Sequence, residues 1–364
     1  MRAPTRFAMG ALASLPLAAC GLFVDYDGYH IADGQGGSGG IDVLGGNGGG
    51  GPCPTGQDFC GGVCIDVTVD PQNCGACDVV CTTTAPSTAA CEGARCVVTL
   101  ASVSGSPGSI ALDATHAYFT NAIMGKVHKV PIGGGNPVEL ATSTAPGRIA
   151  VNASYVVWEA DASTLRKVPL SGSASSQVAT TGGISALAVD ASSAYYASGT
   201  TIYKVSLSGG TPTTLLTLTG YPTSLAVVGS TLYFTYAGAV ESVSTSGGTT
   251  TKLAWDQGTA YGIGVTASNV YWSDGYTLRG VAAAGGEWVD ISTPWSMTQF
   301  VTDAQFAYGA YAGSLQKATL ASSMSTPPVE LRANVLGNPI VDDNSIYWLE
   351  AGNGVAKVMK LTPK

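Results

Sequence analysis

Short apolar runs separated by turn-forming residues make up most of the chain after residue 105. Runs of four to eight largely apolar positions, such as "SIALD", "RIAVN" and "TTLLTL", alternate with Gly, Ser, Thr, Asn and Pro. Runs of this length bounded by turn residues are typical of β-strands, whereas an amphipathic helix needs a longer apolar period. We therefore predict an all-β structure for this part of the chain.

These runs form a repeat, whose clearest mark is a pair of large side chains. The first member of the pair advances by 39, 38, 38, 38, 37 and 39 residues. Each unit contains four short runs separated by turn signals, with the pair in the second run. Four strands in about 38 residues are typical of a β-propeller blade. The seven pairs are Tyr118-Phe119, Val157-Trp158, Tyr195-Tyr196, Tyr233-Phe234, Tyr271-Trp272, Tyr308-Gly309 and Tyr347-Trp348.

The motifs "YFTN" (118–121) and "YWSD" (271–274) resemble those of the NHL and YWTD-type propeller repeats. The resemblance covers residues 97–364 and implies a propeller without indicating its ligand. The seventh unit ends after its third run, "VAKVMKL", and the segment "VVTLAS" just after Cys96 reads as the missing fourth. Pairing the two would leave no incomplete blade. We therefore predict a seven-bladed β-propeller of four-stranded blades, closed by an N-terminal strand; six or eight blades are the alternatives.

The repeated residues are interpreted as structural. Both faces of a second strand are covered by other blades, so the paired aromatics serve packing more readily than ligand stacking. An acidic or amide side chain recurs at the turn before this strand. Hydrogen bonding to the backbone of the turn explains it better than a role in acid catalysis. These residues are Asp113, Asn152, Asp190, Asp303 and Asp342.

The N-terminus has the pattern of an export signal. Residues 1–19 combine Arg2 and Arg6 with an apolar stretch, and that stretch is shorter than the roughly 20 residues of a membrane span. The sequence Leu17-Ala18-Ala19-Cys20 resembles the bacterial lipobox, which implies a lipid on Cys20, and the following Gly implies the outer membrane. A cleaved signal with an incidental Cys and a short membrane anchor are the alternatives. Residues 20–52 are Gly-rich and predict a flexible linker.

Residues 53–96 form a Cys-rich module. Cys20 aside, the remaining cysteines number eight, which favours four disulfides in an oxidising compartment. The pairing stays open, because eight cysteines allow 105 pairings. A metal site is disfavoured because Cys74 and Cys77 have no second such pair and no His lies in the module. The segment "CGGVCIDVTVDPQNCGACDVVC" also resembles a module of unknown function in surface proteins of some Gram-negative bacteria. The cysteines are Cys53, Cys60, Cys64, Cys74, Cys77, Cys81, Cys91 and Cys96.

Composition narrows the choice of function. The net charge is −8 and no Lys/Arg-rich run occurs, which excludes a nucleic-acid partner on electrostatic grounds. The three histidines, His30, His116 and His128, are scattered along the chain. No phosphate-binding loop, nucleophile elbow or zinc-binding helix motif occurs. We therefore predict no catalytic, cofactor or metal residue.

A binding site should lie where the units depart from the repeat. Loops between units and loops between second and third strands share one face in the usual propeller arrangement, and units four and five hold most of the unusual aromatics. Exposed Trp and Tyr beside carboxylates suit a protein or a glycan. The alternative is that these rings cover blade edges or the channel rim. The candidate residues are Tyr221, Trp255, Asp256, Tyr261, Asp274, Tyr276 and Trp295.

Three functions follow as hypotheses. The first is a lipid-anchored envelope protein whose propeller binds a protein or glycan. The second is a secreted hydrolase or lyase acting on polysaccharide or small esters, with Asp161 and Asp274 as candidate acids. The third is a scaffold subunit of an envelope complex. A pair of carboxylates at the channel mouth would favour the enzyme.

Overall fold

The computed structural model describes residues 53–321, 327–333 and 335–364, so the predicted signal peptide, Cys20 and the Gly-rich linker lie outside it. The described residues form strands and turns, and no helix long and apolar enough to cross a membrane occurs among them. The described residues make one compact unit.

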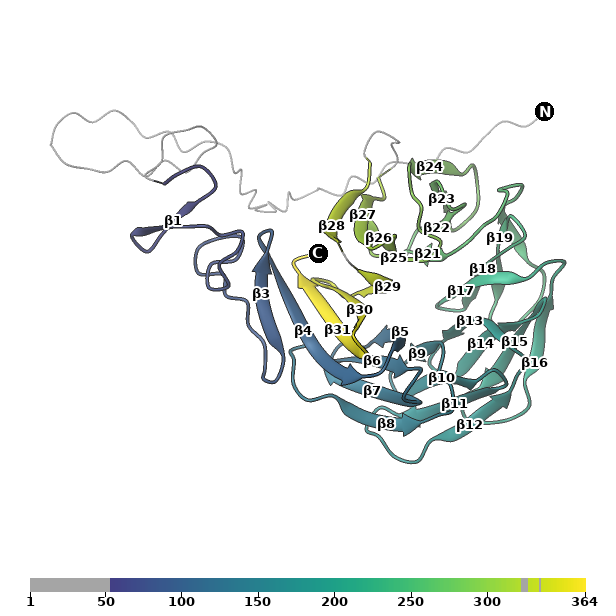
Figure 1. Cartoon of the computed structure of the whole chain (residues 1–364). Helices are drawn as coiled ribbons and strands as arrows, with labels where there is room; N and C mark the ends of the chain where they lie inside the picture. Colours follow the sequence, from purple (N-terminus) through teal and green to yellow (C-terminus); the bar gives the residue numbers. More distant parts are fainter. Residues whose placement is uncertain (1–52, 322–326, 334) are drawn as a thin grey trace, which may run out of the picture. The chain divides into compact units, whose positions relative to one another are not determined.

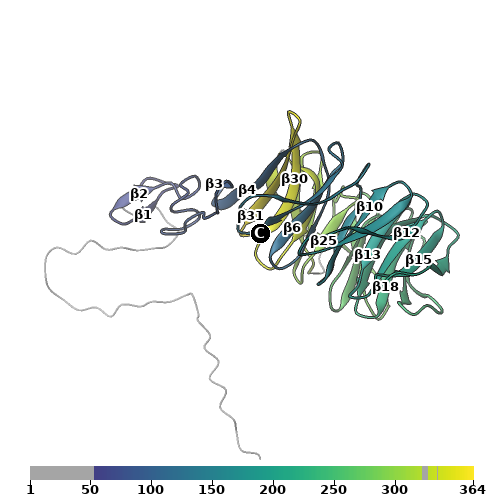
Figure 2. The ribbon, with the colours of Figure 1, turned by 90° about the horizontal axis from the view of Figure 1, so that it is seen from below.

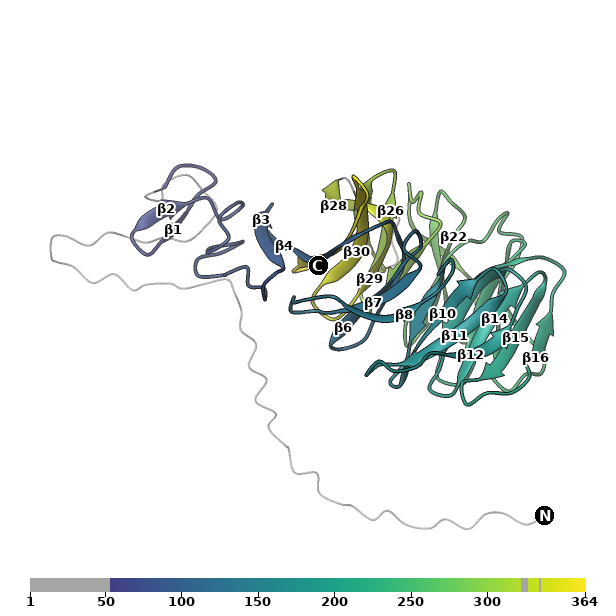
Figure 3. The ribbon, with the colours of Figure 1, turned by 60° about the horizontal axis from the view of Figure 1, so that its bottom comes forward.

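Seven sheets carry the predicted blades, and in the first six blades the strands follow one another in chain order (Figure 1). The first strands of the blades gather at the centre of the ring and the fourth strands lie at its outside (Figure 1). Figure 3 shows the outer strands of blades two and three from another side. Blades one to three comprise β5 (Pro107–Leu112), β6 (His116–Asn121), β7 (Lys126–Pro131), β8 (Val138–Thr142); β9 (Ile149–Val151), β10 (Tyr155–Asp161), β11 (Thr164–Pro169), β12 (Ser176–Thr180); and β13 (Ile184–Val189), β14 (Ser193–Ser198), β15 (Thr201–Ser206), β16 (Thr213–Thr217).

Blades four to six repeat this order, and the first strands of blades five and six have three residues, as in blade two. They comprise β17 (Pro222–Val228), β18 (Thr231–Tyr236), β19 (Ala239–Ser244), β20 (Thr251–Ala254); β21 (Ile263–Val265), β22 (Asn269–Ser273), β23 (Leu278–Ala282), β24 (Val289–Ser292); and β25 (Phe300–Thr302), β26 (Phe306–Tyr311), β27 (Ser314–Thr319), β28 (Val329–Ala333).

The last blade is closed by a strand from the N-terminal side of the ring, which confirms the prediction. Its chain-terminal strands are β29 (Leu336–Val341), β30 (Ile346–Gly352) and β31 (Val355–Thr362), and β4 (Arg95–Ser104) is the fourth. β4 pairs antiparallel with β31 over its whole length, from Val355 opposite Ser104 to Thr362 opposite Cys96. β3 (Thr88–Glu92) adds a fifth strand beyond β4 (Figure 1).

The paired side chains of the second strands are core, as predicted. Six of the seven second members are large and almost fully buried: Phe119, Trp158, Tyr196, Phe234, Trp272 and Trp348. Each hydrophobic cluster joins two neighbouring blades; one, for example, combines Val157 and Leu165 of blade two with Tyr196 and Val205 of blade three. Apolar burial between blades is therefore the main force that holds the ring together.

The recurrent acidic residue organises the turn before the second strand, again as predicted. Oδ1 of Asp113 accepts hydrogen bonds from the backbone N–H groups of Thr115 at 2.7 Å and His116 at 2.8 Å, and Oδ2 accepts one from the Tyr118 hydroxyl at 2.6 Å. Asp190, Asp303 and Asp342 make the same contact with a Tyr five residues later, and Asn152 accepts from two turn amides. These side chains stabilise a turn and a buried phenol.

Lysines on the third strands join neighbouring blades, a feature that the sequence reasoning missed. Each donates from Nζ to a backbone carbonyl of the next blade around the ring. The pairs are Lys129 with Leu170 at 2.6 Å, Lys167 with Leu207, Lys204 with Thr245 at 2.8 Å, and Lys360 with Ile132 at 3.0 Å. At the equivalent positions blades four and five carry Ser242 and Gly280, and they also lack the turn carboxylate.

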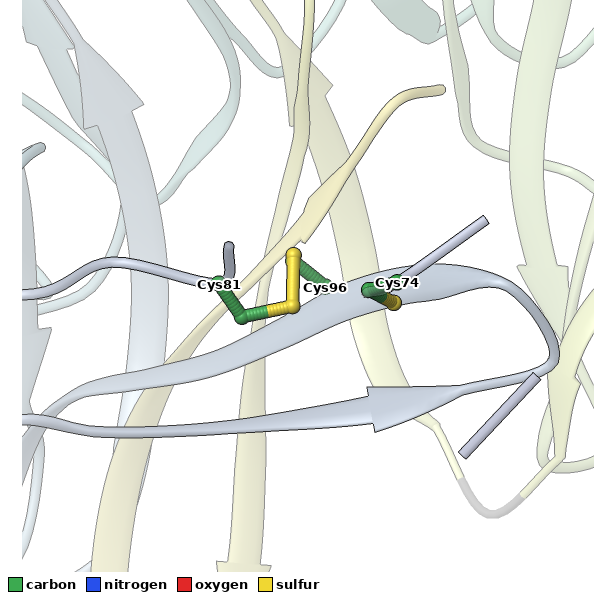
Figure 4. Close-up of side chains that lie close together, drawn as sticks. All are labelled: Cys74, Cys81 and Cys96. Atoms are coloured by element: carbon green, nitrogen blue, oxygen red, sulfur yellow. A yellow bond between two sulfur atoms is a disulfide. The ribbon is translucent and has the colours of Figure 1, made fainter. Parts of the chain in front are cut away.

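The Cys-rich module contains four disulfides, as predicted, and the hairpin of β1 (Asp58–Cys60) and β2 (Val63–Ile65) (Figure 2). The pairs are Cys53–Cys64, Cys60–Cys77, Cys74–Cys91 and Cys81–Cys96. The sulfur atoms of Cys74, Cys81 and Cys96 lie within 4.8 Å of one another (Figure 4). All three are disulfide-bonded, so none is a free thiolate able to hold a metal ion.

Cys96 lies in β4, so the disulfide from Cys81 fastens the module directly to the strand that closes the ring. Backbone contacts add to it, because the N–H of Thr84 donates to the carbonyl of Gly133 in blade one at 3.0 Å. β4 begins at Arg95, so no linker separates the predicted module (53–96) from the predicted propeller (97–364).

Candidate functional site

The loops predicted to form a binding face lie together on blade four. The backbone N–H of Gln257 donates to the carbonyl of Gly238 at 3.1 Å, which places the β20–β21 loop against the β18–β19 turn. A Cβ added at Gly220 would lie 2.6 Å from Cβ of Ala237, so the β16–β17 loop contacts the same turn. Gly220 and Gly238 allow these close approaches.

The corresponding loops of blade five are joined in the same way. Tyr261 donates from its backbone N–H to the carbonyl of Ser273 at 2.8 Å, and its ring would lie 3.3 Å from a Cβ added at Gly275. The N–H of Trp295 donates to the carbonyl of Tyr276 at 2.5 Å. Inter-blade loops and second-to-third-strand turns therefore share one end of these blades, as the sequence predicted.

Three aromatic side chains stand out from these loops into solvent. The exposed fractions are 71% for Tyr221, 59% for Trp255 and 64% for Tyr276. We call these three residues the aromatic face. Side chains of this size are normally buried, because each ring removes a large apolar area from water. Large rings that stay exposed on contacting loops of two adjacent blades mark a surface suited to binding.

The two acidic candidates, Asp256 and Asp274, differ in how far their carboxylates are engaged in the contacts of their own loops. Asp256 is exposed on the same loop as Trp255 and has a positive φ of 56°. Asp274 is fully engaged: Oδ1 accepts from the N–H groups of Tyr276 at 2.8 Å and Thr277 at 2.7 Å, and Oδ2 pairs with Arg279 at 3.0 Å. Asp274 therefore orders the turn that carries Tyr276, which is a positioning role.

Arg279 is the centre of a polar network behind the aromatic face, and the sequence reasoning missed it. Its guanidinium contacts Asp274, donates from Nε to Asp290 at 2.9 Å and from Nη1 to Oε1 of Gln257 at 3.1 Å, and lies 4.9 Å from the ring of Trp288. Gln257 in turn donates to the carbonyl of Trp255 at 2.7 Å. One cation thus connects the loop of Trp255 with the turn of Tyr276. Nothing in the repeat distinguished Arg279, because the residues at the same position in the other blades are already varied: His128, Arg166, Tyr203, Glu241, Gln316 and Met359.

Trp295 does not belong to this surface, and the prediction that it would be exposed there is wrong. It is fully buried and packs at right angles against Phe300, with ring centroids 6.0 Å apart. Blade six has Gly309 where other blades have a second large side chain, and a Cβ at Gly309 would meet Met297 at 2.5 Å and Trp295 at 3.3 Å. Trp295 and Met297 fill the space that Gly309 leaves, which is why the ring is inside.

The first strands of the blades surround a central channel of about 300 Å³. Of the charged side chains, only that of Arg148 lines it among the described residues, and no Asp or Glu does so. The carboxylate pair that would favour a hydrolase or lyase is therefore missing from the described lining. Asp161, the other candidate acid, accepts hydrogen bonds from the N–H and hydroxyl of Ser163, both at 2.8 Å, and caps its own turn.

Solved structures with the same fold resemble the chain at low sequence identity. The CNH domain of AfRom2 is 11% identical with a TM-score of 0.56, and the match covers 74% of this chain and 99% of that one. The WD40 domain of Pan2 from Neurospora crassa is 9% identical with a TM-score of 0.55, and the match covers 74% of this chain and 96% of that one. The computationally designed Ika8 protein is 14% identical with a TM-score of 0.53, and the match covers 71% of this chain and 98% of that one.

At such identities the likeness shows the fold and nothing further. No protein-family model matches the chain, and no curated protein is similar to it in sequence. What the comparisons establish is a β-propeller, a fold commonly used as a platform for protein interactions.

Proposed function

We propose that this chain is a cell-envelope binding protein, in which the propeller presents the aromatic face to a protein partner. The observation that carries the proposal is the joint exposure of Tyr221, Trp255 and Tyr276 on contacting loops of blades four and five. Tyr and Trp are the residues most often found at the energetic centres of protein interfaces. Arg279 and Gln257 hold the loops in place, so little order has to be gained on binding.

A glycan of the cell envelope is the second partner that this surface suits, because planar rings also stack on the apolar faces of sugars. Asp256, exposed beside Trp255, adds a carboxylate that could accept hydrogen bonds from hydroxyl groups. The assignment as an outer-membrane lipoprotein rests on the sequence alone. It follows from the lipobox-like Leu17-Ala18-Ala19-Cys20, and acyl chains on Cys20 would hold the propeller at the membrane.

The binding proposal is tested by measuring binding of purified wild type and variants to an array of separated envelope proteins and envelope glycans from the same bacterium. We expect Trp255→Ala and Tyr276→Ala each to weaken binding to one array component by at least about tenfold. The matched control is Ile123→Ala, which removes an even more exposed apolar side chain, 75% exposed, from blade one. Unchanged binding in both aromatic variants, or an equal loss in Ile123→Ala, would refute the proposal.

The membrane anchor is tested separately. Cells fed a clickable fatty acid should label the wild-type protein and leave Cys20→Ser unlabelled, and only the wild type should fractionate with the outer membrane. Equal labelling of the two proteins would show that Cys20 carries no lipid. Neither result bears on the aromatic face, so the two parts of the proposal stand or fall independently.

A further inference from the structure

One position of the first strand carries a polar side chain in five of the seven blades, and together these side chains line the central channel. In blade one the position is that of Ser109. The next residue, Ile110, pairs across the sheet with Phe119, the second member of the aromatic pair. Blades three and five have the small residues Ala186 and Gly262 there. The five polar side chains, all in the channel lining, are Ser109, Arg148, Ser224, Gln299 and Asn338.

Hydrogen bonds between blades use only some of the donors and acceptors of these five side chains. Nη1 of Arg148 donates to the carbonyl of Ile184 at 2.6 Å, and Oγ of Ser224 accepts from the N–H of Ile263 at 3.3 Å. Asn338 donates to Oε1 of Gln299 at 3.3 Å. These bonds fix the side chains in position, which pre-organises whatever they bind next.

The remaining groups have no partner among the described residues. They are the hydroxyl of Ser109, the hydroxyl hydrogen of Ser224, the amide hydrogens of Gln299, the amide oxygen of Asn338, and Nε and Nη2 of Arg148. The set mixes donors with acceptors. A ligand made only of acceptors, such as sulfate, would leave the Asn338 oxygen unmatched, whereas a hydroxyl group both donates and accepts.

The charge of the channel is balanced rather than positive. Oε2 of Glu159 lies 3.4 Å from Nη1 of Arg148, and the Glu159 side chain is only 13% exposed. The pair is therefore close to neutral as seen from the channel, which removes the electrostatic reason to prefer an anion.

Most of the remaining lining residues are apolar, and Ser185 and Thr223 are the polar ones among them. The apolar residues include Ile110, Ile149, Leu225, Ile263 and Phe300, each the next residue along its first strand. A polar ring beside an apolar wall matches a molecule with hydroxyl groups at its edge and C–H groups on its face. The volume of about 300 Å³ lies at the small end of the range for ligand pockets.

From these observations we infer that the central channel binds a neutral monosaccharide-sized polyol, held by the polar ring of Ser109, Arg148, Ser224, Gln299 and Asn338. This site is separate from the aromatic face, because none of Tyr221, Trp255 and Tyr276 lines the channel. The inference therefore does not depend on the proposed function.

The test is isothermal titration of the purified protein with glucose, galactose, mannose, N-acetylglucosamine, glucuronate and inorganic phosphate. We expect at least one neutral sugar to bind with millimolar or better affinity and to bind more tightly than glucuronate or phosphate. Gln299→Leu and Arg148→Met should each weaken that binding by about tenfold, the effect of removing one good hydrogen bond.

Matched controls keep the result interpretable. Gln305→Leu makes the same change in the exposed turn between β25 and β26, and Trp255→Ala alters the aromatic face; both should retain full sugar affinity. Melting temperatures confirm that the channel variants are folded, and Ser224→Ala replaces any that is not. Binding of none of the neutral sugars, tighter binding of glucuronate or phosphate, or equal affinity in folded channel variants would each overturn the inference.

Discussion

At the residue scale, blade six shows how the core keeps its volume when the repeat is interrupted. Gly309 supplies no side chain where the other blades place a large one, and Trp295 and Met297 from the preceding loop occupy the space. The same loop therefore carries a core residue, whereas the loops before it carry the exposed Tyr221 and Trp255. Two tryptophans in equivalent loops have opposite roles for a purely steric reason.

This contrast predicts a large difference in stability between two Trp→Ala variants. Trp295→Ala should lower the free energy of unfolding by about 3–5 kcal/mol, because it opens a cavity in the core. Trp255→Ala should change it by less than about 0.5 kcal/mol, since that ring is largely in water. Urea unfolding followed by fluorescence measures both. Similar values for the two variants would contradict the burial of Trp295.

The Asp–Tyr pairs predict how stability depends on pH. Burial alone would raise the pKa of Asp190, but hydrogen bonds from Tyr195 and from the amides of Ser192 and Ser193 outweigh it and lower the pKa below the ordinary value of 3.8. The same balance lowers the pKa values of Asp113 and Asp303. A lowered pKa in the folded state means that the unfolded state binds protons first. The stabilisation is complete above the ordinary pKa and is lost as the pH falls through the folded-state pKa.

We therefore expect the free energy of unfolding to fall steadily from about pH 5 to about pH 3. Tyr195→Phe removes the phenol donor of Asp190 and should make this fall shallower, whereas Tyr203→Phe, a Tyr facing Tyr196 across the same sheet, should leave it unchanged. Urea unfolding across this pH range compares the three proteins. Parallel pH profiles for wild type and Tyr195→Phe would show that the Asp–Tyr contact does not set the pKa.

At the element scale, the third strands do more than complete a sheet. Where they carry Lys129, Lys167, Lys204 and Lys360, they bond each blade to the next through a backbone carbonyl. Blades four and five, which carry the aromatic face, have lost these lysines together with the turn carboxylates. The proposed recognition residues thus occur in blades that lack these lysine bonds.

Removing one of these lysines should weaken the ring measurably. Lys204→Met keeps most of the aliphatic stem and loses the bond to Thr245, so the free energy of unfolding should fall by about 1.5–3 kcal/mol, as for hydrogen bonds to charged groups. Lys252→Met, an exposed lysine on β20, is the control and should have no measurable effect. Equal stability of the two variants would mean that the lysine bonds do not couple the blades.

At the scale of the whole molecule, closure joins the first and last strands of the propeller segment. β4 completes the last blade beside β31, and the Cys81–Cys96 disulfide fixes β4 to the Cys-rich module. The disulfide spans 15 residues, and a loop of about this length corresponds to about 3 kcal/mol in the chain-entropy account of disulfides.

The paired variant Cys81→Ser/Cys96→Ser should therefore lose about 3 kcal/mol of unfolding free energy. Cys53→Ser/Cys64→Ser, which opens a disulfide away from the propeller, should leave the main propeller transition in place. Calorimetry of the two proteins distinguishes the effects. A propeller transition unaffected by loss of Cys81–Cys96 would show that the module does not support the closure.

Sequence periodicity predicted the ring, its seven blades and the strand that closes it, because these depend on spacing and apolar pattern. It also predicted the roles of Asp113 and Tyr118, which recur and are local in the chain. It did not predict that Trp295 is buried, since this depends on an empty position in a neighbouring strand. Periodicity also did not predict the contacts of Arg279, the disulfide pairing or the polar ring of the channel. Each of these joins residues that are distant in the sequence and come together only in the folded structure.

The most direct test of the central claim is site-specific photo-crosslinking in living cells. A photoreactive amino acid is placed at position 255 or 276 of the aromatic face, and at position 123 of blade one as a control that is at least as exposed. We expect one discrete crosslinked species shared by positions 255 and 276 and absent at position 123. No crosslink at the aromatic face, or the same species at all three positions, would contradict the claim.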